Sequence, residues 1–478
     1  MNPFPLSQLR SVVGGKPLTP MPEGNVFIRS VCTDSRRLET ACLFVAVKGE
    51  RHDGHDYVPA LRGAPEQGPV VAALVERECH AYPPGVYVLQ VGSTRAAMGK
   101  LATHVRRSFT GHVIAVGGSN GKTSTKHLID AALRCKLRGS ISPKSYNNDI
   151  GVPLTIFNHD PLADYLVLEM GTNHHGELKV LSEMALPDVA VITSISHEHL
   201  EGLGDLGGVR REEASIVAGL SSKGLLVVNG DDPELMPHLQ PFVSRGASRV
   251  VTFGFGEHND LFASAIRVTA DGTRFLLNAS RREVFVPMLG RHTASNALAA
   301  IAVARRLGLG EDEVIAALAE ARGPEMRQQL MQVGGVTVLN DAYNANPASV
   351  RSALDTFLTL PVPAGGRRVA VLGEMRELGE ASAALHAEVG RLVATMPLDV
   401  VVGVGEGARG LLDAAVSAGL PAGRAAWFAD SVAAGQYVRE WVVPADVVLL
   451  KGSRGVRLEA VLAAMAGRSA AAETRRVG

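Results

Sequence analysis

The chain has little cysteine and lacks any segment that would carry it into or across a membrane. Its four cysteines, Cys32, Cys42, Cys79 and Cys135, form no CxxC pair and show no metal-type spacing. That pattern favours reduced thiols packed inside a cytosolic protein. No stretch of about 18 apolar residues occurs, and the N-terminus has no basic segment followed by an apolar run. We therefore expect a cytoplasmic protein with no membrane insertion.

An excess of charge of either sign is also absent. Lys and Arg together number 48, as do Asp and Glu, so the formal net charge at pH 7 is zero. This balance argues against nucleic acid or a membrane surface as the partner. Any recognition of an anion then depends on a local cluster of residues. We expect small-molecule substrates and a monomeric protein.

The length of 478 residues predicts several domains, roughly two to four. Residues 1–90 mix short β-rich runs with glycines, which predicts a small α/β domain. In residues 91–323 apolar strands alternate with helical patterns, as in a parallel doubly wound sheet. The breaker cluster Arg322-Gly323-Pro324 precedes a third α/β segment, residues 324–478. The predicted fold class is α/β with three domains.

A glycine-rich loop follows the predicted strand at 112–116 and precedes an apolar-striped helix; it reads Gly117-Gly118-Ser119-Asn120-Gly121-Lys122-Thr123-Ser124. Glycines let backbone N–H groups converge on phosphate oxygens, while Lys122 can reach the β/γ-phosphates and the Thr123 hydroxyl suits Mg²⁺. The usual GxxxxGK[ST] pattern has a glycine where this chain has Val116. A chance glycine turn is the alternative, but GKT at a strand-to-helix junction favours binding of a nucleoside triphosphate.

Two later strands end on residues suited to metal and phosphate chemistry. The strand 165–169 delivers Glu169 to the edge of the sheet where open parallel sheets hold their ligands, so we expect Glu169 to bind Mg²⁺. The next strand leads to His197 and His199. Closely spaced histidines are often structural, and HxH alone is a weak metal signal. Two cations beside a triphosphate would support phosphoryl transfer, to a carboxylate if an acyl phosphate is made.

Taken together, the loop 118–123, Glu169 after its strand and His199 within His-Leu-Glu-Gly resemble the Mur ligases, and the resemblance extends over nearly the whole chain. It implies a central P-loop ATPase domain flanked by an N-terminal domain that binds the UDP part of the substrate and a Rossmann-like C-terminal domain. It also implies ATP and Mg²⁺ as cofactors. It places Asn296 near the adenine, Arg327 at the γ-phosphate and Asp341 near the ribose.

The motif Asp341-Ala342-Tyr343-Asn344-Ala345-Asn346-Pro347 resembles the form found in the family members that add D-alanyl-D-alanine to a UDP-N-acetylmuramoyl tripeptide. Asn346 is also a good helix N-cap and Pro347 suits a first turn, so a plain capped helix is the alternative. That alternative does not explain the residues ahead of the cap. The substrate-binding residues that the resemblance implies are Ser35, Arg36, Lys48, Asn147, Asn148, Tyr343, Asn344, Asn346, Lys451 and Ser453.

Three positions depart from the family pattern. Glu213 lies fourteen residues after His199, where many members have a lysine that becomes carbamylated. We hypothesise that its carboxylate replaces the carbamate as a metal-side ligand; the alternative is a solvated helix face. Gly117 stands where threonine is common, and Asn340 where aspartate often precedes the motif. Neither removes a group that the mechanism needs.

By resemblance, the tripeptide carboxylate attacks ATP to give an acyl phosphate, and the dipeptide amine then displaces phosphate. We expect the catalytic residues to be Lys122, Glu169, His199, Glu213 and Arg327, and the metal-side residues to be Thr123, Glu169, His199 and Glu213. One rival is a sister ligase that adds a different amino acid. Another is a P-loop ATPase or kinase, which needs no amine substrate. A third is a scaffold protein that keeps the fold without catalysis.

Overall fold

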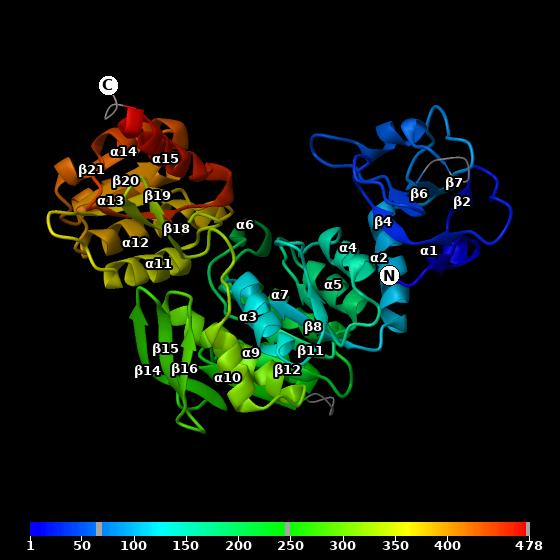
Figure 1. The fold of residues 1–478 in the computed structure, drawn as a ribbon, viewed down its shortest axis with the longest axis horizontal. Helices are drawn as coiled ribbons and strands as arrows, with labels where there is room; N and C mark the ends of the chain where they lie inside the picture. The colour runs from blue at the N-terminus through cyan, green and yellow to red at the C-terminus, as the bar shows by residue number, and fades with distance from the viewer. Residues whose placement is uncertain (64–68, 244–248, 475–478) are drawn as a thin grey trace.

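The computed structural model describes residues 1–63, 69–243 and 249–474 and contains three larger β-sheets (Figure 1). Each sheet falls inside one of the three predicted segments, and the predicted α/β class is confirmed. We propose that the domain boundaries lie at residues 90/91 and 323/324. Among the described residues, no helix is both long and apolar enough to cross a membrane.

The N-terminal sheet has the order β2-β7-β6-β5-β4, and β1 pairs separately with β3. Its pairs are parallel except for β2 with β7. The elements are β1 (Phe4–Pro5), α1 (Leu9–Val13), β2 (Lys16–Pro17), β3 (Phe27–Ile28), β4 (Ser30–Cys32), β5 (Cys42–Val45), β6 (Val70–Val75), β7 (Tyr87–Gln90) and the connecting helix α2 (Thr94–Ser108). Helix α2 packs its apolar side into a core shared by this sheet and the central one.

The central sheet has nine strands in the order β16-β15-β14-β13-β12-β11-β8-β10-β9. Its strands are β8 (His112–Gly117), β9 (Gly139–Ile141), β10 (Tyr165–Glu169), β11 (Val189–Ile192), β12 (Leu225–Asn229), β13 (Arg249–Gly254), β14 (Leu261–Thr269), β15 (Gly272–Leu277) and β16 (Glu283–Val286). Its helices are α3 (Lys122–Arg134), α4 (Gly151–Asn158), α5 (Glu177–Ala185), α6 (Leu200–Leu203), α7 (Leu206–Ala214), α8 (Met236–Val243), α9 (Arg291–Arg306) and α10 (Glu311–Ala319).

The strand order of the central sheet reverses at β8, which lies between β10 and β11 and is parallel to both. Helices α3, α9 and α10 cover one face, while α2, α4 and α5 cover the other. The strands β8, β10 and β11 are buried on both faces, which explains their nearly continuous apolar sequence. Ligands of open α/β sheets bind at the carboxyl ends of the strands beside such a reversal.

The third sheet has the order β17-β18-β22-β19-β20-β21. Helices α11, α12 and α13 pack on one face, and α14 and α15 pack on the other. Its elements are β17 (Gln329–Val333), β18 (Val336–Asp341), α11 (Pro347–Thr359), β19 (Arg368–Gly373), α12 (Ser382–Ala394), β20 (Val400–Val404), α13 (Glu406–Ser417), β21 (Ala425–Phe428), α14 (Ser431–Trp441), β22 (Val447–Lys451) and α15 (Glu459–Thr474). Figure 1 shows this sheet and the N-terminal one on opposite sides of the central sheet.

The alternation of strands and helices predicted a parallel sheet, but the sheets also contain antiparallel pairs. Strand β14 pairs parallel with β13, but β15 pairs antiparallel with both β14 and β16, and β17 pairs antiparallel with β18. The turn between β17 and β18 is Gly334-Gly335, with φ of 58° and 82°. Two central residues with positive φ form the type I′ turn that suits a two-residue hairpin. The Gly-Gly pair is therefore the sequence signal for this hairpin.

Candidate active site

A cavity of about 820 Å³ lies at the carboxyl ends of the central strands and is closed on one side by the third sheet and α11. Residues from the glycine loop, the segment 145–149, the end of β10 and the segment 341–346 line it together. The predicted site residues that line it are Ser119, Asn120, Gly121, Lys122, Ser124, Asn147, Asn148, Glu169, His199, Asn296, Arg327, Asp341, Tyr343, Asn344, Asn346 and Lys451. Most of the predicted site is thus gathered in one place.

The glycine loop is held in its conformation by the segment after β11. Gly118 has φ of 111°, and a Cβ added there would lie 2.3 Å from Oγ1 of Thr193, so only glycine fits. Backbone N–H of Ser119 donates to the carbonyl of Ser194 over 2.6 Å, and the Thr193 hydroxyl donates to the carbonyl of Asn120 over 2.6 Å. The loop is therefore preformed to receive phosphate oxygens.

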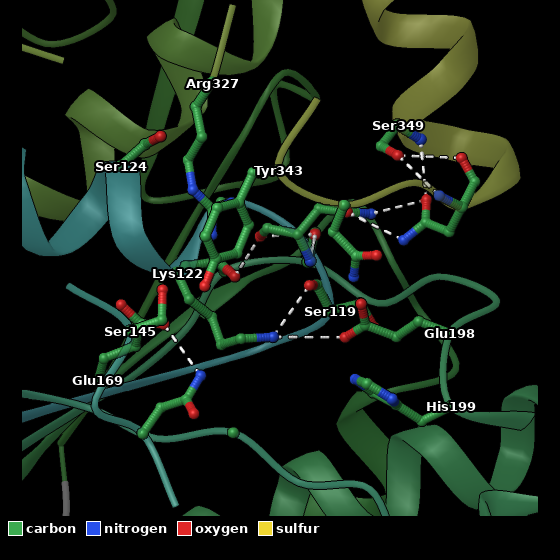
Figure 2. A pocket seen from close by; sticks show the side chains of 18 of the residues that line it. Ser119, Lys122, Ser124, Ser145, Glu169, Glu198, His199, Arg327, Tyr343 and Ser349 are labelled. Atoms are coloured by element: carbon green, nitrogen blue, oxygen red, sulfur yellow. Dashed lines mark hydrogen bonds and ion pairs between the residues drawn. The ribbon is translucent and has the colours of Figure 1, made fainter. Parts of the chain in front are cut away.

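Lys122 begins α3 and extends its ammonium group back across the loop (Figure 2). Its Nζ donates to the carbonyl of Ser119 over 3.0 Å and lies 3.4 Å from Oε1 of Glu198. Burial lowers the pKa of Lys122, but the carboxylates of Glu198, Glu213 and Glu169 outweigh burial, so the pKa lies above its ordinary value. The lysine is therefore a fixed positive charge at the place expected for the triphosphate.

Glu169 ends β10, and each of its carboxylate oxygens has one neighbour. Its Oε2 lies 3.0 Å from the ammonium of Lys126, and its Oε1 accepts from Nδ2 of Asn147 over 3.1 Å. Burial raises the pKa of Glu169, but Lys126 and Arg327 outweigh it and bring the pKa below its ordinary value. A buried carboxylate that stays ionised is suited to contact a divalent cation.

His199 lies at the edge of the cavity and contacts Glu377, which follows strand β19 of the third sheet. Its Nδ1 lies 2.5 Å from Oε2 of Glu377, and the backbone N–H of Glu201 donates to the Glu377 carbonyl over 3.3 Å. Burial lowers the pKa of His199, but Glu377 and Glu198 outweigh burial and raise the pKa above its ordinary value. The imidazole is thus positioned by a residue from the far side of the cavity.

Glu213, in α7, is buried beneath the glycine loop. Its Oε2 accepts from the backbone N–H of Gly118 over 2.6 Å. Burial, together with nearby Glu198, raises the pKa of Glu213 to about 7. A Cβ added at Gly117 would lie 3.0 Å from that same oxygen. The two departures from the family pattern therefore meet in space, and Glu213 is no part of a solvated helix face.

The expected nucleotide contacts come from both sides of the cavity. Asn296, in α9, is buried, and among the described residues its Nδ2 has no hydrogen-bond partner. The guanidinium of Arg327 stacks 4.2 Å from the ring centroid of Tyr343 (Figure 2). Asp341 is paired with Lys451, whose Nζ lies 2.9 Å from Oδ2 and also donates to the carbonyl of Asn344 over 2.7 Å. Lys451 thus supports the segment around Asp341.

Asn346 connects α11, which packs on the third sheet, with the glycine loop of the central sheet. It caps α11, because its side chain accepts from the backbone N–H of Ser349 over 2.9 Å. Its Nδ2 donates to Oδ1 of Asn120 over 3.0 Å, while Nδ2 of Asn120 donates to Oδ1 of Asn346 over 3.3 Å. Asn120 also donates to the hydroxyl of Ser196 over 2.7 Å. The predicted N-cap is confirmed, and the side chain in addition contacts the glycine loop.

Several predicted site residues do not line the cavity. These include Gly118 in the loop, Thr123 in α3 and Glu213 in α7, whose carboxylate bonds to the Gly118 N–H. Ser453 accepts from the backbone N–H of Arg376 over 2.9 Å and lies behind Ala345. The N-terminal residues of this group are Ser35, Arg36 and Lys48. Their expected contact with the UDP part of a substrate stays a prediction.

Comparison with known proteins identifies the family. The model of the Mur ligase middle domain matches residues 116–304, and that of the Mur ligase, glutamate ligase domain matches residues 326–454. The UDP-N-acetylmuramoyl-tripeptide--D-alanyl-D-alanine ligase of Bacillus subtilis is 33% identical over 96% of this chain and 97% of its own. The chain belongs to the Mur ligase family. The enzyme of the same name from Escherichia coli is 34% identical over 96% of this Mur ligase and 98% of its own length.

Solved structures of the family share the whole architecture of this Mur ligase. A MurF structure from Acinetobacter baumannii superposes with a TM-score of 0.85 at 29% identity, covering 98% of this chain and 99% of that one. MurF ligase from Thermotoga maritima in complex with ADP gives a TM-score of 0.80 at 27% identity over 93% of this chain and 99% of that one. The predicted three-domain Mur ligase architecture is confirmed.

The sequence reading missed some residues at the site of this Mur ligase. Glu198, between His197 and His199, was assigned no role, and it is the carboxylate closest to the Lys122 ammonium among the described acidic residues. Lys126 lies four residues after Lys122, a spacing that puts both on one side of a helix. Gln328 lines the cavity with a buried Oε1 that has no partner in the described structure. Of these three residues, only Lys126 could have been found from the sequence, by its helical spacing from Lys122.

The loop of this Mur ligase that carries Glu377 is held by a buried histidine. The Nε2 atom of His386 accepts from the backbone N–H of Met375 over 2.9 Å, and its Nδ1 donates to the carbonyl of Ser382 over 2.8 Å. Burial lowers the pKa of His386, so the folded protein favours the neutral ring. The stability that this ring contributes is complete above the pKa of the unfolded chain, about 6.5, and is lost as pH falls below it.

We predict that lowering the pH from about 7 to about 5 reduces the free energy of unfolding less in His386→Gln than in the native chain. Glutamine keeps an acceptor for the Met375 N–H but does not titrate. Thermal unfolding of both proteins at the two pH values measures the difference, and the other buried histidines affect both alike. Parallel loss of stability in the two proteins would contradict the prediction.

Proposed function

We propose that this Mur ligase joins D-alanyl-D-alanine to a UDP-N-acetylmuramoyl tripeptide, with hydrolysis of ATP to ADP and phosphate, as a step of peptidoglycan synthesis. Relatives with that printed name align over nearly its whole length. The observation that carries the proposal is a single cavity lined by the phosphate loop, by Glu169 and by the segment Tyr343 to Asn346. A simple ATPase has no need for that last segment.

The reaction has two steps. A carboxylate oxygen of the tripeptide attacks the γ-phosphorus of ATP, the bond from phosphorus to the β,γ-bridging oxygen breaks, and ADP leaves. The amine nitrogen of the dipeptide then attacks the acyl carbon, inorganic phosphate leaves with its bonding electrons, and the nitrogen loses a proton to give the amide. The acyl phosphate is sensitive to water, so exclusion of water from the cavity during the reaction would favour amide formation over hydrolysis.

We assign charge stabilisation in the first step to Lys122 and Arg327. Lys122 is held by the loop carbonyls beside Glu198, and Arg327 is stacked on Tyr343 across the cavity. Two preorganised cations on opposite sides of the γ-phosphate would stabilise charge that develops on its oxygens. Asn296, Asp341 and the loop residues 118–124 would hold the nucleotide.

Mg²⁺ fits the donor set that we propose for it. The buried Thr123 hydroxyl has no hydrogen-bond partner within the described part of the chain, and Glu169 is an ionised carboxylate at the same strand ends. Among the described residues, no three His, Cys, Asp or Glu side chains converge on one metal position. This is expected for Mg²⁺, which takes one or two protein ligands and completes its shell with water and substrate phosphates. When bound, it would neutralise phosphate charge.

His199 and Glu213 remain proposed ligands on the metal side. Each has one atom committed elsewhere, His199 Nδ1 to Glu377 and Glu213 Oε2 to the Gly118 N–H. In this proposal, the remaining Nε2 of His199 and Oε1 of Glu213 face the cation or its water shell. We also retain the cytoplasmic location and the monomeric state as predictions.

The test of the function is phosphate release from ATP by purified protein given UDP-N-acetylmuramoyl tripeptide, with and without D-alanyl-D-alanine, followed by mass spectrometry. We expect release to need both substrates and the product to gain the mass of the dipeptide less one water. Release that ignores the dipeptide would support an ATPase, and a product with another amino acid would support a sister ligase. Either result would overturn the proposal.

A further inference from the structure

A second lysine on α3 is buried behind the proposed phosphate site. Lys126 follows Lys122 by one helical turn and is 0% exposed, which is rare for a lysine. Its ammonium group has three donors. They meet three acceptors: the carbonyl of Ser142 at 2.9 Å, the carbonyl of Lys144, and Oε2 of Glu169 at 3.0 Å. The buried charge is therefore fully satisfied.

Those acceptors connect Glu169 with the loop at 142–148. The hydroxyl of Ser142 accepts from the backbone N–H of Glu169 over 3.0 Å, and Asn147 donates its Nδ2 to Oε1 of Glu169 over 3.1 Å. The carbonyl of Asn147 accepts from the backbone N–H of Gly171 over 2.8 Å. The same loop presents Ser145, Asn147 and Asn148 to the cavity. Lys126 thus lies at the centre of a bonded unit that forms one wall.

We propose that Lys126 is a positioning residue that fixes the substrate-facing loop 142–148 and the Glu169 carboxylate relative to the phosphate loop. The inference rests on the proposed function and adds a residue to it. Helix α3 begins at Lys122, so one rigid element sets the position of the nucleotide site at its first residue and of the substrate wall at its fifth. Lys126 has no contact with the cavity itself.

A buried ion pair can also be a mere packing feature, and the two roles predict different measurements. If Lys126 only packs, its removal lowers thermal stability and leaves the Michaelis constants unchanged. If it positions the loop, its removal loosens 142–148 locally and weakens use of the tripeptide more than use of ATP. Loss of groups that orient the ligands of a metal site typically costs about 10- to 100-fold in affinity or activity.

The experiment compares the native protein with Lys126→Met, which keeps a long apolar stem but removes the charge. We expect the KM for the tripeptide to rise about tenfold or more and the KM for ATP to rise by a smaller factor. Limited trypsin digestion gives a readout that is independent of activity, because Lys144 is exposed within the loop. We expect faster cleavage after Lys144, with cleavage after the exposed Lys179 of α5 unchanged.

The matched control is Lys136→Met, which removes an exposed lysine just beyond the same helix, and it should behave as the native protein. If Lys126→Met does not fold, the double variant Lys126→Met/Glu169→Gln, which removes both buried charges, is used for the digestion. The Michaelis constants are then measured on Lys126→Arg. Native Michaelis constants and native cleavage after Lys144 would overturn the proposal. If the native protein makes no amide, the proposed function fails, while the digestion still decides the role of Lys126.

Discussion

Replacing Lys122 by methionine lowers kcat by about 10³-fold, the loss that removal of a preorganised charge at a phosphoryl transfer centre produces. The ammonium is held by a loop carbonyl beside Glu198, and the other lysine of α3, Lys126, is buried and does not line the cavity. Steady-state amide formation at saturating substrates measures the effect. The remaining carboxylates then repel the triphosphate, so the KM for ATP rises as well.

The control for this substitution is Lys179→Met on the exposed side of α5, whose lysine pairs only loosely with Glu183 at 3.8 Å. It should retain native kcat because exposed ion pairs contribute about 0–1 kcal/mol. Circular dichroism and thermal unfolding confirm that both variants fold. Turnover by Lys122→Met within about tenfold of native would refute the role in charge stabilisation.

Removal of the Glu213 carboxylate is the second change with a large expected effect. Glu213→Ala leaves the Gly118 N–H without its acceptor and deletes the proposed metal-side oxygen, so we expect kcat to fall by about 10²-fold. Because the native carboxylate needs no carbamylation, turnover of the native protein should not change when bicarbonate and dissolved carbon dioxide are removed. Amide formation measured in degassed and in bicarbonate-containing buffer tests this point.

Glu213→Gln separates the two roles of the side chain. Glutamine can still accept from the Gly118 N–H but carries no charge. We expect it to remain as impaired as alanine if the carboxylate acts on the metal side. Full activity in Glu213→Gln would assign the residue to loop support alone, and full activity in Glu213→Ala would remove both roles.

Local sequence patterns predicted the parts of the site that a single strand–loop–helix unit creates. The phosphate loop is legible because Gly118 has no space for a Cβ and Lys122 begins a helix directly after it. Glu169 is legible because a buried parallel strand ends on it. Asn346 and Pro347 predict the helix cap because asparagine is favoured at the N-cap and proline in the first turn. In each case the residues that cause the structure are neighbours in the chain.

Features that depend on distant segments could not be read in this way. The pairing of Glu377 with His199 and of Asn346 with Asn120 joins residues more than a hundred positions apart. The contact of Gly117 with Glu213 depends on how α7 packs beneath the loop. Antiparallel β14 to β16 were missed because edge strands with one exposed face resemble loop sequence when no partner is known.

The reciprocal hydrogen bonds between the side-chain amides of Asn120 and Asn346 have a thermodynamic consequence. Separation of the two sides leaves the two side-chain amides to be rehydrated, while Asn120 keeps its hydrogen bond to Ser196, so the paired and separated arrangements are distinct states. Asn120 belongs to the glycine loop, and Asn346 caps α11. By linkage, the factor by which ATP favours the paired state equals the factor by which pairing tightens ATP. If the glycine loop binds ATP as proposed, the nucleotide would thereby bias how closely α11 approaches the loop.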